Sequence, residues 1–234
     1  MLKISDITKF TLQDYPGNVA CIVWFAGCNM RCRYCHNAEL VRQEDGFLDE
    51  KAVFDFLEAK VNLLDGVVLS GGECTMAAEL GDFIARIKNL GFRVRIDTNG
   101  LNTAVVRHLV DNYLIDSVAL DFKAPKNKFT SVTQLDSALY DTFENTLKFL
   151  VANLLEKKID LEIRTTVHTS LLDETDVNKI IEILDDLGYS EIFYIQNYTD
   201  TGGKILTNLG RQNWILKKEE IKKPEHFSVG YRNF

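Results

Sequence analysis

The chain has 234 residues, of which 46% are hydrophobic and 26% are charged, and its formal net charge is -7. This acidic balance argues against a general affinity for nucleic-acid backbones or anionic membranes, because both require clustered lysines and arginines. The first residues, MLKISDITKF, lack the apolar core of a signal peptide, and no run of about 18 apolar residues occurs. We therefore expect a cytoplasmic globular protein without nucleic-acid or membrane partners.

The predicted elements alternate between strands and helices along the chain. Apolar runs predict strands at residues 19–26, 66–70, 92–97, 117–122, 159–167 and 191–196. Apolar residues three or four apart predict helices between them, at residues 54–64, 80–90, 106–113, 139–154 and 177–187. Buried strands joined by helices form a parallel sheet, and right-handed crossovers curl it into a barrel. The expected fold is a single α/β domain over residues 1–234, a full or partial (β/α)6 TIM-like barrel with a charged surface tail or helix at about residues 205–234.

The unusual residues of this sequence follow the predicted strands directly. In chain order they are Gly27-Cys28, Ser70-Gly71-Gly72-Glu73, Asp97-Thr98-Asn99-Gly100, Asp121-Phe122-Lys123, Arg164 and Gln196. The carboxyl ends of parallel strands meet at one rim of a barrel, and chemistry in such folds collects there. We therefore expect these residues to surround one site.

The loop after the first predicted strand, AGCNMRCRYCHN, carries three of the five cysteines of the chain. In a reducing compartment, clustered cysteines indicate metal or redox chemistry more often than disulfides. Four interpretations are open: haem attached to Cys32 and Cys35, zinc on Cys28, Cys32, Cys35 and His36, packing on one helical face, and an iron–sulfur cluster. Haem attachment needs export, zinc sites usually join two separated ligand groups, and the glycine and asparagine of this loop make a poor buried helix.

The number of cysteines favours the iron–sulfur interpretation. Thiolates suit iron and sulfide, and a tight loop can wrap three corners of a cubane cluster. Electron-transfer clusters normally take four cysteines, so Cys28, Cys32 and Cys35 would leave one iron open to a ligand. Cys21, inside the first predicted strand, is expected in the core.

The loop resembles the signature of the radical S-adenosylmethionine (radical SAM) enzymes, and the following His36-Asn37 is typical of their branch that activates glycyl radical enzymes. Further matches are Asp14-Tyr15-Pro16-Gly17, Gly71-Gly72-Glu73, Asp97-Thr98-Asn99-Gly100 and Asp121-Phe122-Lys123. The set is most similar to the anaerobic ribonucleoside-triphosphate reductase activating proteins, which have Asp-Tyr-Pro-Gly where pyruvate formate-lyase activases have Asp-Gly-Pro-Gly. The resemblance implies the partial barrel of radical SAM type.

The resemblance also implies two cofactors. A 4Fe-4S cluster would be held by Cys28, Cys32 and Cys35, and S-adenosylmethionine would chelate the open iron. The cofactor-binding residues implied by matching position are Tyr34 and His36 at the adenine, Gly71, Gly72 and Glu73 at the methionine amine, and Lys123 and Arg164 near the carboxylate or ribose. Gln196 is a further candidate for the same cofactor.

A monovalent cation is implied beside the cofactor carboxylate, at Asp97, Thr98 and Asp121. Two carboxylates placed together repel each other unless a cation joins them. Plain alternatives exist for all these residues, namely a packed loop aromatic, a glycine-rich or Asn-Gly turn, and a surface salt bridge. Cys74 departs from the family, where proline is usual; we expect its side chain to pack, and a thiol near a cluster could be sensitive to oxidants.

The activity implied by the resemblance is the generation of a radical. A low-potential donor such as flavodoxin or ferredoxin would reduce the cluster, and S-adenosylmethionine would be cleaved to methionine and a 5'-deoxyadenosyl radical. That radical would take a hydrogen atom from one glycine of a partner glycyl radical enzyme, so no side-chain acid or base is expected. The alternatives are an activase of another enzyme such as pyruvate formate-lyase, a radical SAM enzyme acting on a small molecule, and a non-enzymatic electron carrier or zinc module.

Overall fold

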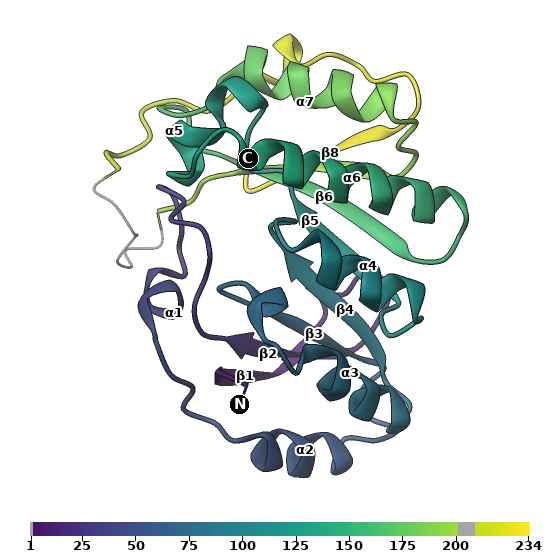
Figure 1. Ribbon diagram of the computed structural model, residues 1–234. Coiled ribbons are helices and arrows are strands. Elements are labelled where there is room, and N and C mark those ends of the chain that lie inside the picture. The colour runs from purple at the N-terminus through teal and green to yellow at the C-terminus, as the bar shows by residue number, and fades with distance from the viewer. Residues whose placement is uncertain (1, 201–208) are drawn as a thin grey trace.

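The computed structural model describes residues 2–200 and 209–234. Within these residues, eight strands form one curved sheet whose order follows the chain (Figure 1). The strands are β1 (Ile4–Thr11), β2 (Ala20–Phe25), β3 (Gly66–Gly71), β4 (Arg93–Thr98), β5 (Ser117–Asp121), β6 (Asp160–Val167), β7 (Ile192–Asn197) and β8 (Ser228–Arg232). β1 is antiparallel to β2, and every later pair of neighbours is parallel. Because β1 and β8 are the two ends of this order, the described sheet is a partial barrel.

The longer helices cover the outer side of the sheet, whereas α1 and α5 lie at its rim (Figure 1). The helices of the described chain are α1 (Ala38–Arg42), α2 (Glu50–Glu58), α3 (Leu80–Asn89), α4 (Thr103–Asp111), α5 (Phe129–Thr133), α6 (Leu139–Leu155) and α7 (Glu174–Asp186), with 3-10 turns η1 (Cys74–Met76), η2 (Lys126–Lys128) and η3 (Lys218–Glu220). Asp49 caps the start of α2, since its side chain accepts a hydrogen bond from the N–H of Ala52. Gly188 ends α7 with a φ of +71°, a left-handed conformation that favours glycine.

Alternation along the strands separates an apolar outer face from a more polar inner face. Outward residues such as Val94 and Ile96 of β4 are fully buried against the helices in the main core. A second, small apolar cluster on the other face contains Tyr15, Ala20, Ile22 and Val68. The inner positions of β4 and β6 instead carry charges, at Arg95, Asp97, Glu162 and Arg164. The barrel interior is therefore a place where charged side chains meet.

The structure adds two edge strands to the six predicted ones. β1 and β8 are only partly buried, so neither shows the apolar run that marks a central strand. The prediction of a surface tail or helix at about residues 205–234 is wrong for residues 228–232, because they form β8 and pair with β7. Residues 205–208 of that segment lie outside the described residues. In the described part of the chain, no helix is both long and apolar enough to cross a membrane.

Candidate functional site

A cavity of about 410 Å³ opens at the carboxyl ends of the parallel strands. Of the residues expected around the site, Gly27, Gly100 and Phe122 do not line this cavity, whereas all those assigned to a cofactor do: Cys28, Cys32, Tyr34, Cys35, His36, Gly71, Gly72, Glu73, Asp97, Thr98, Asp121, Lys123, Arg164 and Gln196. These residues come from the loop after β2 and from the ends of β3 to β7. The rim of the barrel thus brings together motifs that lie up to 168 positions apart in the sequence, from Cys28 to Gln196.

The cysteine loop is an irregular segment held by backbone hydrogen bonds. The N–H groups of Arg31 and Arg33 donate to the carbonyl oxygens of Thr133 and Val132 in α5, at 3.1 and 3.0 Å. The Arg31 guanidinium donates to the carbonyl oxygens of Cys28 and Met30, at 2.6 and 2.8 Å. Because the segment is not helical, the interpretation as three cysteines on one helical face is wrong.

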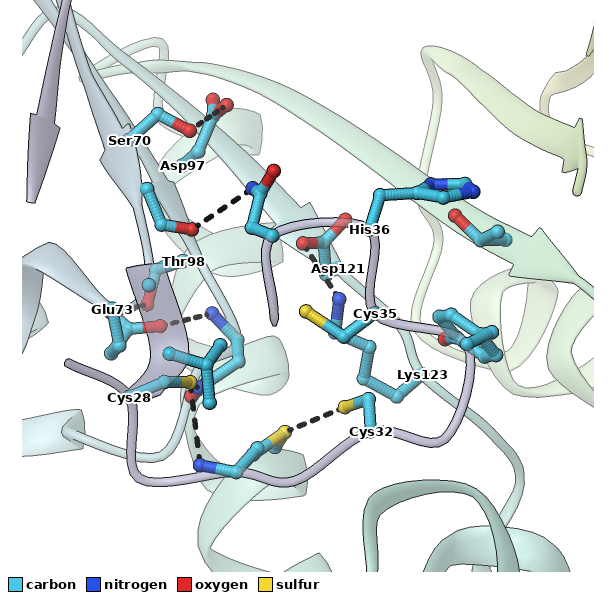
Figure 2. Close-up of a pocket in the computed structure, with 18 of the residues that line it drawn as sticks. Cys28, Cys32, Cys35, His36, Ser70, Glu73, Asp97, Thr98, Asp121 and Lys123 are labelled. Atoms are coloured by element: carbon cyan, nitrogen blue, oxygen red, sulfur yellow. Dashed lines mark hydrogen bonds and ion pairs between the residues drawn. The ribbon is translucent and has the colours of Figure 1, made fainter. Parts of the chain in front are cut away.

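The three thiols face the cavity from this loop (Figure 2). The N–H of Met30 already donates to the Cys28 sulfur at 3.3 Å. Burial raises the pKa of the Cys28 thiol to about 11 and that of the Cys32 thiol to about 12, and it also raises the pKa of Cys35. The thiols are therefore protonated at neutral pH, and binding of a metal would release their protons.

The arrangement does not suit a single zinc ion. Zinc ligands lie only about 2.0 to 2.3 Å from the metal, yet no three cysteine, histidine or acidic side chains among the described residues are close enough to hold one ion. His36 is also engaged elsewhere, because its Nε2 lies 2.8 Å from the carbonyl oxygen of Thr199 and its ring stacks on Tyr198 at 4.7 Å. Thiols spread around a cavity fit a multinuclear cluster better.

The two glycines after β3 allow two backbones to approach closely. A Cβ atom at Gly72 would lie 1.8 Å from the carbonyl oxygen of Gly27, and one at Gly71 would lie 2.3 Å from that of Phe25. The N–H groups of Gly72 and Glu73 donate to those carbonyls, of Phe25 and Gly27 respectively, both at 2.9 Å. Besides lining the cavity, the glycines therefore fix the start of the cysteine loop.

Glu73 is the centre of a buried hydrogen-bonded cluster. Its carboxylate accepts from the hydroxyls of Thr75 and Thr98 at 2.5 and 2.8 Å, and from the N–H of Asn99 at 2.8 Å. Burial raises the pKa of this carboxyl, while the hydrogen bonds oppose that rise. The Thr98 hydroxyl therefore points to Glu73, and the structure groups it with this cluster rather than with Asp97 and Asp121 (Figure 2).

Asp97 and Asp121 are joined by a guanidinium group. Arg164 Nε lies 2.8 Å from Asp121 Oδ1, and its Nη2 lies 3.2 Å from Asp97 Oδ2. Lys123 Nζ lies 2.9 Å from the second oxygen of Asp121, and Ser70 donates to Asp97 at 3.0 Å (Figure 2). Burial alone would raise the pKa of Asp121, but Arg164 and Lys123 hold it far below its usual range. These ion pairs are partly buried inside the barrel, with side chains 18% to 22% exposed, so Lys123 and Arg164 do not form the surface salt bridges of the alternative interpretation.

Ser70 and Asn99, which the sequence places at the rim, also line the cavity. Further lining residues that the sequence does not assign to the site are Asp14, Trp24, Met30, Asn37, Val41 and Thr166. Most of them directly flank a predicted motif, which is the signal that could have identified them. Tyr198 is different, because it reaches the site only by stacking on His36 and lies 4.9 Å, ring to ring, from His168.

The two remaining cysteines belong to the core. Cys21 in β2 and Cys74 in η1 are both fully buried. The Cys74 sulfur lies 3.6 Å from the carbonyl oxygen of Asp97, and burial holds the pKa of its thiol well above the usual value. A thiol without thiolate character is a poor target for oxidants, so the expected packing of Cys74 is found and the structure gives no basis for its sensitivity.

The donor set of the cavity fits the implied cofactors. Three soft sulfur donors come from the cysteine loop, and cations and carboxylates come from the strand ends, with Lys123 beside Cys32 and Cys35 (Figure 2). The volume of about 410 Å³ is large enough for a small-molecule cofactor. The hydroxyl of Tyr34 is buried and has no hydrogen-bond partner among the described residues.

A family model described as the radical SAM superfamily matches residues 22–187. The chain belongs to the radical SAM superfamily. It is 32% identical over 200 residues to a Methanocaldococcus jannaschii protein provisionally named as a glycyl-radical enzyme activating enzyme, covering 83% of this chain and 79% of the relative. It is 28% identical over 226 residues to the pyruvate formate-lyase 1-activating enzyme of Escherichia coli, covering 89% of this chain and 82% of that enzyme. This radical SAM enzyme is thus homologous to glycyl-radical enzyme activating enzymes.

A solved structure confirms the predicted fold. The structure of Streptococcus suis SuiB bound to S-adenosylmethionine has a TM-score of 0.63 to this chain at 15% identity. The likeness covers 91% of this chain but 52% of SuiB, so the chain spans about half the length of that protein. The family binds S-adenosylmethionine and a 4Fe-4S cluster, and the donor set described above suits both.

Proposed function

We propose that this radical SAM enzyme activates a glycyl radical enzyme, and that its partner is an anaerobic ribonucleoside-triphosphate reductase. The observation that carries the proposal is the cavity, in which Cys28, Cys32 and Cys35 face the ion pairs of Asp121, Lys123 and Arg164. When bound, the cluster supplies an electron for reductive cleavage of S-adenosylmethionine, which leads to removal of a hydrogen atom from a glycine of the partner. The chain's own residues bind, orient and shield these groups.

The thiols of Cys28, Cys32 and Cys35 hold the cluster in this proposal. Lys123 and Arg164 supply positive charge for the carboxylate or ribose of S-adenosylmethionine, and Glu73 with Gly71 and Gly72 faces its amine. Tyr34 and His36 border the adenine, and Gln196 is a further contact. Since these side chains are largely prearranged in hydrogen bonds and ion pairs, the cofactor would meet charges that need little reorganisation.

Anaerobic reconstitution with iron and sulfide tests this proposal. We expect about four iron and four sulfide per chain, and a cluster spectrum by electron paramagnetic resonance that changes when S-adenosylmethionine is added. The matched control adds adenosine and methionine separately. Tight binding of zinc without sulfide would contradict the proposal, and so would a cluster spectrum that does not change when S-adenosylmethionine is added.

The choice of partner rests on Asp14-Tyr15-Pro16-Gly17. Tyr15 is 2% exposed and packs on Gly66, where a Cβ would lie 2.9 Å from its ring. Tyrosine at this position therefore needs glycine at the start of β3, so the two residues act as a pair. Asp14 lines the cofactor cavity, and the motif accordingly runs from the cavity to the base of the barrel.

Separate incubation with the two candidate partners tests the choice. The reduced enzyme and S-adenosylmethionine would be mixed with an anaerobic ribonucleoside-triphosphate reductase or with pyruvate formate-lyase. We expect a glycyl radical doublet with the reductase and none with pyruvate formate-lyase. The reverse result would assign the other partner, and 5'-deoxyadenosine formed only with a small metabolite would contradict activation of any glycyl radical enzyme. The proposed electron donors are tested by a second experiment, in which reduced flavodoxin or ferredoxin replaces dithionite as the reductant and formation of 5'-deoxyadenosine is measured.

A monovalent cation at Asp97, Thr98 and Asp121 is part of the same proposal. Arg164 already places a positive charge between the two carboxylates, and Thr98 is bonded to Glu73. A cation would therefore join these carboxylates beside Arg164, which keeps its position between them. Affinity for S-adenosylmethionine should be higher in potassium or sodium than in choline buffers of equal ionic strength, and equal affinities would contradict this step.

A further inference from the structure

The charged side chains inside the barrel form a network that continues below the cofactor cavity. Arg95 precedes Asp97 by two positions on β4, and its Nε lies 3.5 Å from Asp97 Oδ1. Its Nη2 lies 3.3 Å from Glu162 Oε1 on β6, two positions before Arg164. Arg95 and Glu162 line a separate cavity of about 280 Å³ beneath the first. The network thus connects the cofactor end of the barrel to a deeper layer.

Glu162 is the carboxylate on which three guanidinium groups converge. Arg232 of β8 binds it in a fork, with Nη1 at 2.9 Å from Oε1 and Nη2 at 3.2 Å from Oε2. Arg95 lies at 3.3 Å and Arg164 Nη1 at 3.9 Å from the same Oε1. The side chain of Glu162 is 8% exposed, so these charges interact with little screening by water.

Arg95 and Arg164 share the same two carboxylates, Asp97 and Glu162. Asp97 also accepts a hydrogen bond from Ser70, which limits the oxygen lone pairs left for cations. Without the charge of Glu162, Asp97 would be the remaining carboxylate bound to Arg95 in this network. Arg95 would then compete with Arg164 for Asp97 and displace the guanidinium at the cofactor end.

We infer that Glu162 and Arg232 are positioning residues: they hold Arg95 on Glu162 and thereby keep Arg164 in place between Asp97 and Asp121. Neither Glu162 nor Arg232 lines the cofactor cavity, so both would affect S-adenosylmethionine only through the position of Arg164. The edge strand β8 therefore contributes to the site through Arg232. This inference rests on the proposed function, because it takes S-adenosylmethionine as the occupant of the cavity.

Binding of S-adenosylmethionine to the reconstituted enzyme tests the inference, measured anaerobically by calorimetry before any partner is added. We expect Glu162→Gln to raise the dissociation constant roughly tenfold and Arg232→Gln roughly threefold, because Arg95 still engages Glu162 in the second variant. Glu162→Asp, which keeps the charge, should lie closer to the wild type than Glu162→Gln. The matched control is Arg93→Gln, which breaks an exposed Arg93–Asp160 pair at 3.0 Å between β4 and β6 outside this network and should leave the dissociation constant unchanged.

Unfolding by urea, measured on the same variants, separates positioning from stability. If Glu162→Gln lowers the free energy of unfolding but leaves the dissociation constant unchanged, Glu162 merely stabilises the fold and the inference is overturned. If Glu162→Gln fails to fold, Arg232→Gln decides, since it leaves the buried carboxylate paired with Arg95. A wild-type enzyme that binds no S-adenosylmethionine would overturn the proposed function and the inference together, whereas normal binding by wild type and both variants would overturn the inference alone.

Discussion

The two sides of the cofactor cavity are stabilised in opposite ways. On the loop side, burial favours the protonated thiols of Cys28, Cys32 and Cys35, and the loop is held by hydrogen bonds from the backbone N–H groups of Arg31 and Arg33 to α5. On the strand side, Asp121 and Arg164 are fully charged and already paired. The loop side thus gains negative charge only when its thiols bind metal, whereas the strand side has its charges fixed by folding. One rim of the barrel thus combines a neutral metal-binding loop with an ionic surface that is arranged by folding.

The largest expected effect comes from removing a thiol on the loop side. Cys28→Ala, Cys32→Ala and Cys35→Ala should each abolish cleavage of S-adenosylmethionine rather than slow it, because the cluster loses one of its three protein ligands. Iron and sulfide content after anaerobic reconstitution, with 5'-deoxyadenosine formation, measures this. Cys21→Ala is the control, since Cys21 is buried in β2 away from the cavity; equal iron in Cys28→Ala and Cys21→Ala would contradict the assignment.

Gly72→Ala should damage the contact that joins the two sides. The added Cβ would overlap the carbonyl oxygen of Gly27 at 1.8 Å, so the backbone must shift. We expect a loss of about 3 kcal/mol in the free energy of unfolding, measured by urea denaturation. Gly210→Ala is the control, because nothing lies within 4 Å of its Cβ position. If Gly72→Ala lowered the free energy of unfolding as little as Gly210→Ala does, the contact between Gly72 and Gly27 would not contribute to stability.

Asp121→Asn should weaken the strand side while sparing the loop side. It leaves the partly buried Arg164 and Lys123 with less opposing charge, which should lower the free energy of unfolding by about 2 kcal/mol. The variant should still incorporate iron and sulfide at the wild-type level. Asp160→Asn, which removes an exposed partner of Arg93, should change the free energy of unfolding by less than about 0.5 kcal/mol. Loss of the cluster in Asp121→Asn would mean that the two sides are not independent.

The smallest expected effect is a change in acid stability. Burial alone would raise the pKa of Glu162, but Arg232, Arg95 and Arg164 outweigh burial and hold the pKa below its usual value. A lowered pKa in the folded state contributes stability above the unfolded value, near pH 4.3, and loses it as pH falls below that value. The free energy of unfolding of Glu162→Gln should therefore fall less steeply than that of the wild type below about pH 4. Parallel pH profiles would contradict the assigned pairing.

The sequence was sufficient to predict the central strands and the rim. Buried parallel strands produce continuous apolar runs, which mark them in the sequence. Functional residues in such folds follow the carboxyl ends of the strands, and this rule correctly predicts that Asp97, Lys123 and Gln196 line one cavity. The edge strands β1 and β8 escaped prediction because half-exposed strands lack such runs. Local pattern is thus informative where both faces of a strand are covered.

The sequence could not predict which charged side chains pair inside the barrel. Arg95, Glu162 and Arg232 lie within strands that are separate in sequence, and a charge in a strand is normally a solvent-facing residue. Their pairing depends on the curvature of the sheet, which brings β8 back toward β4 across the interior. Likewise, the sequence motif indicates only a cofactor contact for Gly71 and Gly72. The close approach of the Gly27 backbone to Gly72 depends on the three-dimensional arrangement of the two loops.

The hydrogen bonds of Arg31 and Arg33 to α5 should affect how the enzyme loses and regains its cluster. These bonds use backbone N–H groups and carbonyl oxygens, so they require no metal at the thiols. Loss of a bound cluster to oxygen would therefore leave this anchoring in place, and a new cluster would form without refolding of the chain. The loop should also resist trypsin after Arg31 and Arg33 in the metal-free form, because a protease must first pull the loop away from α5.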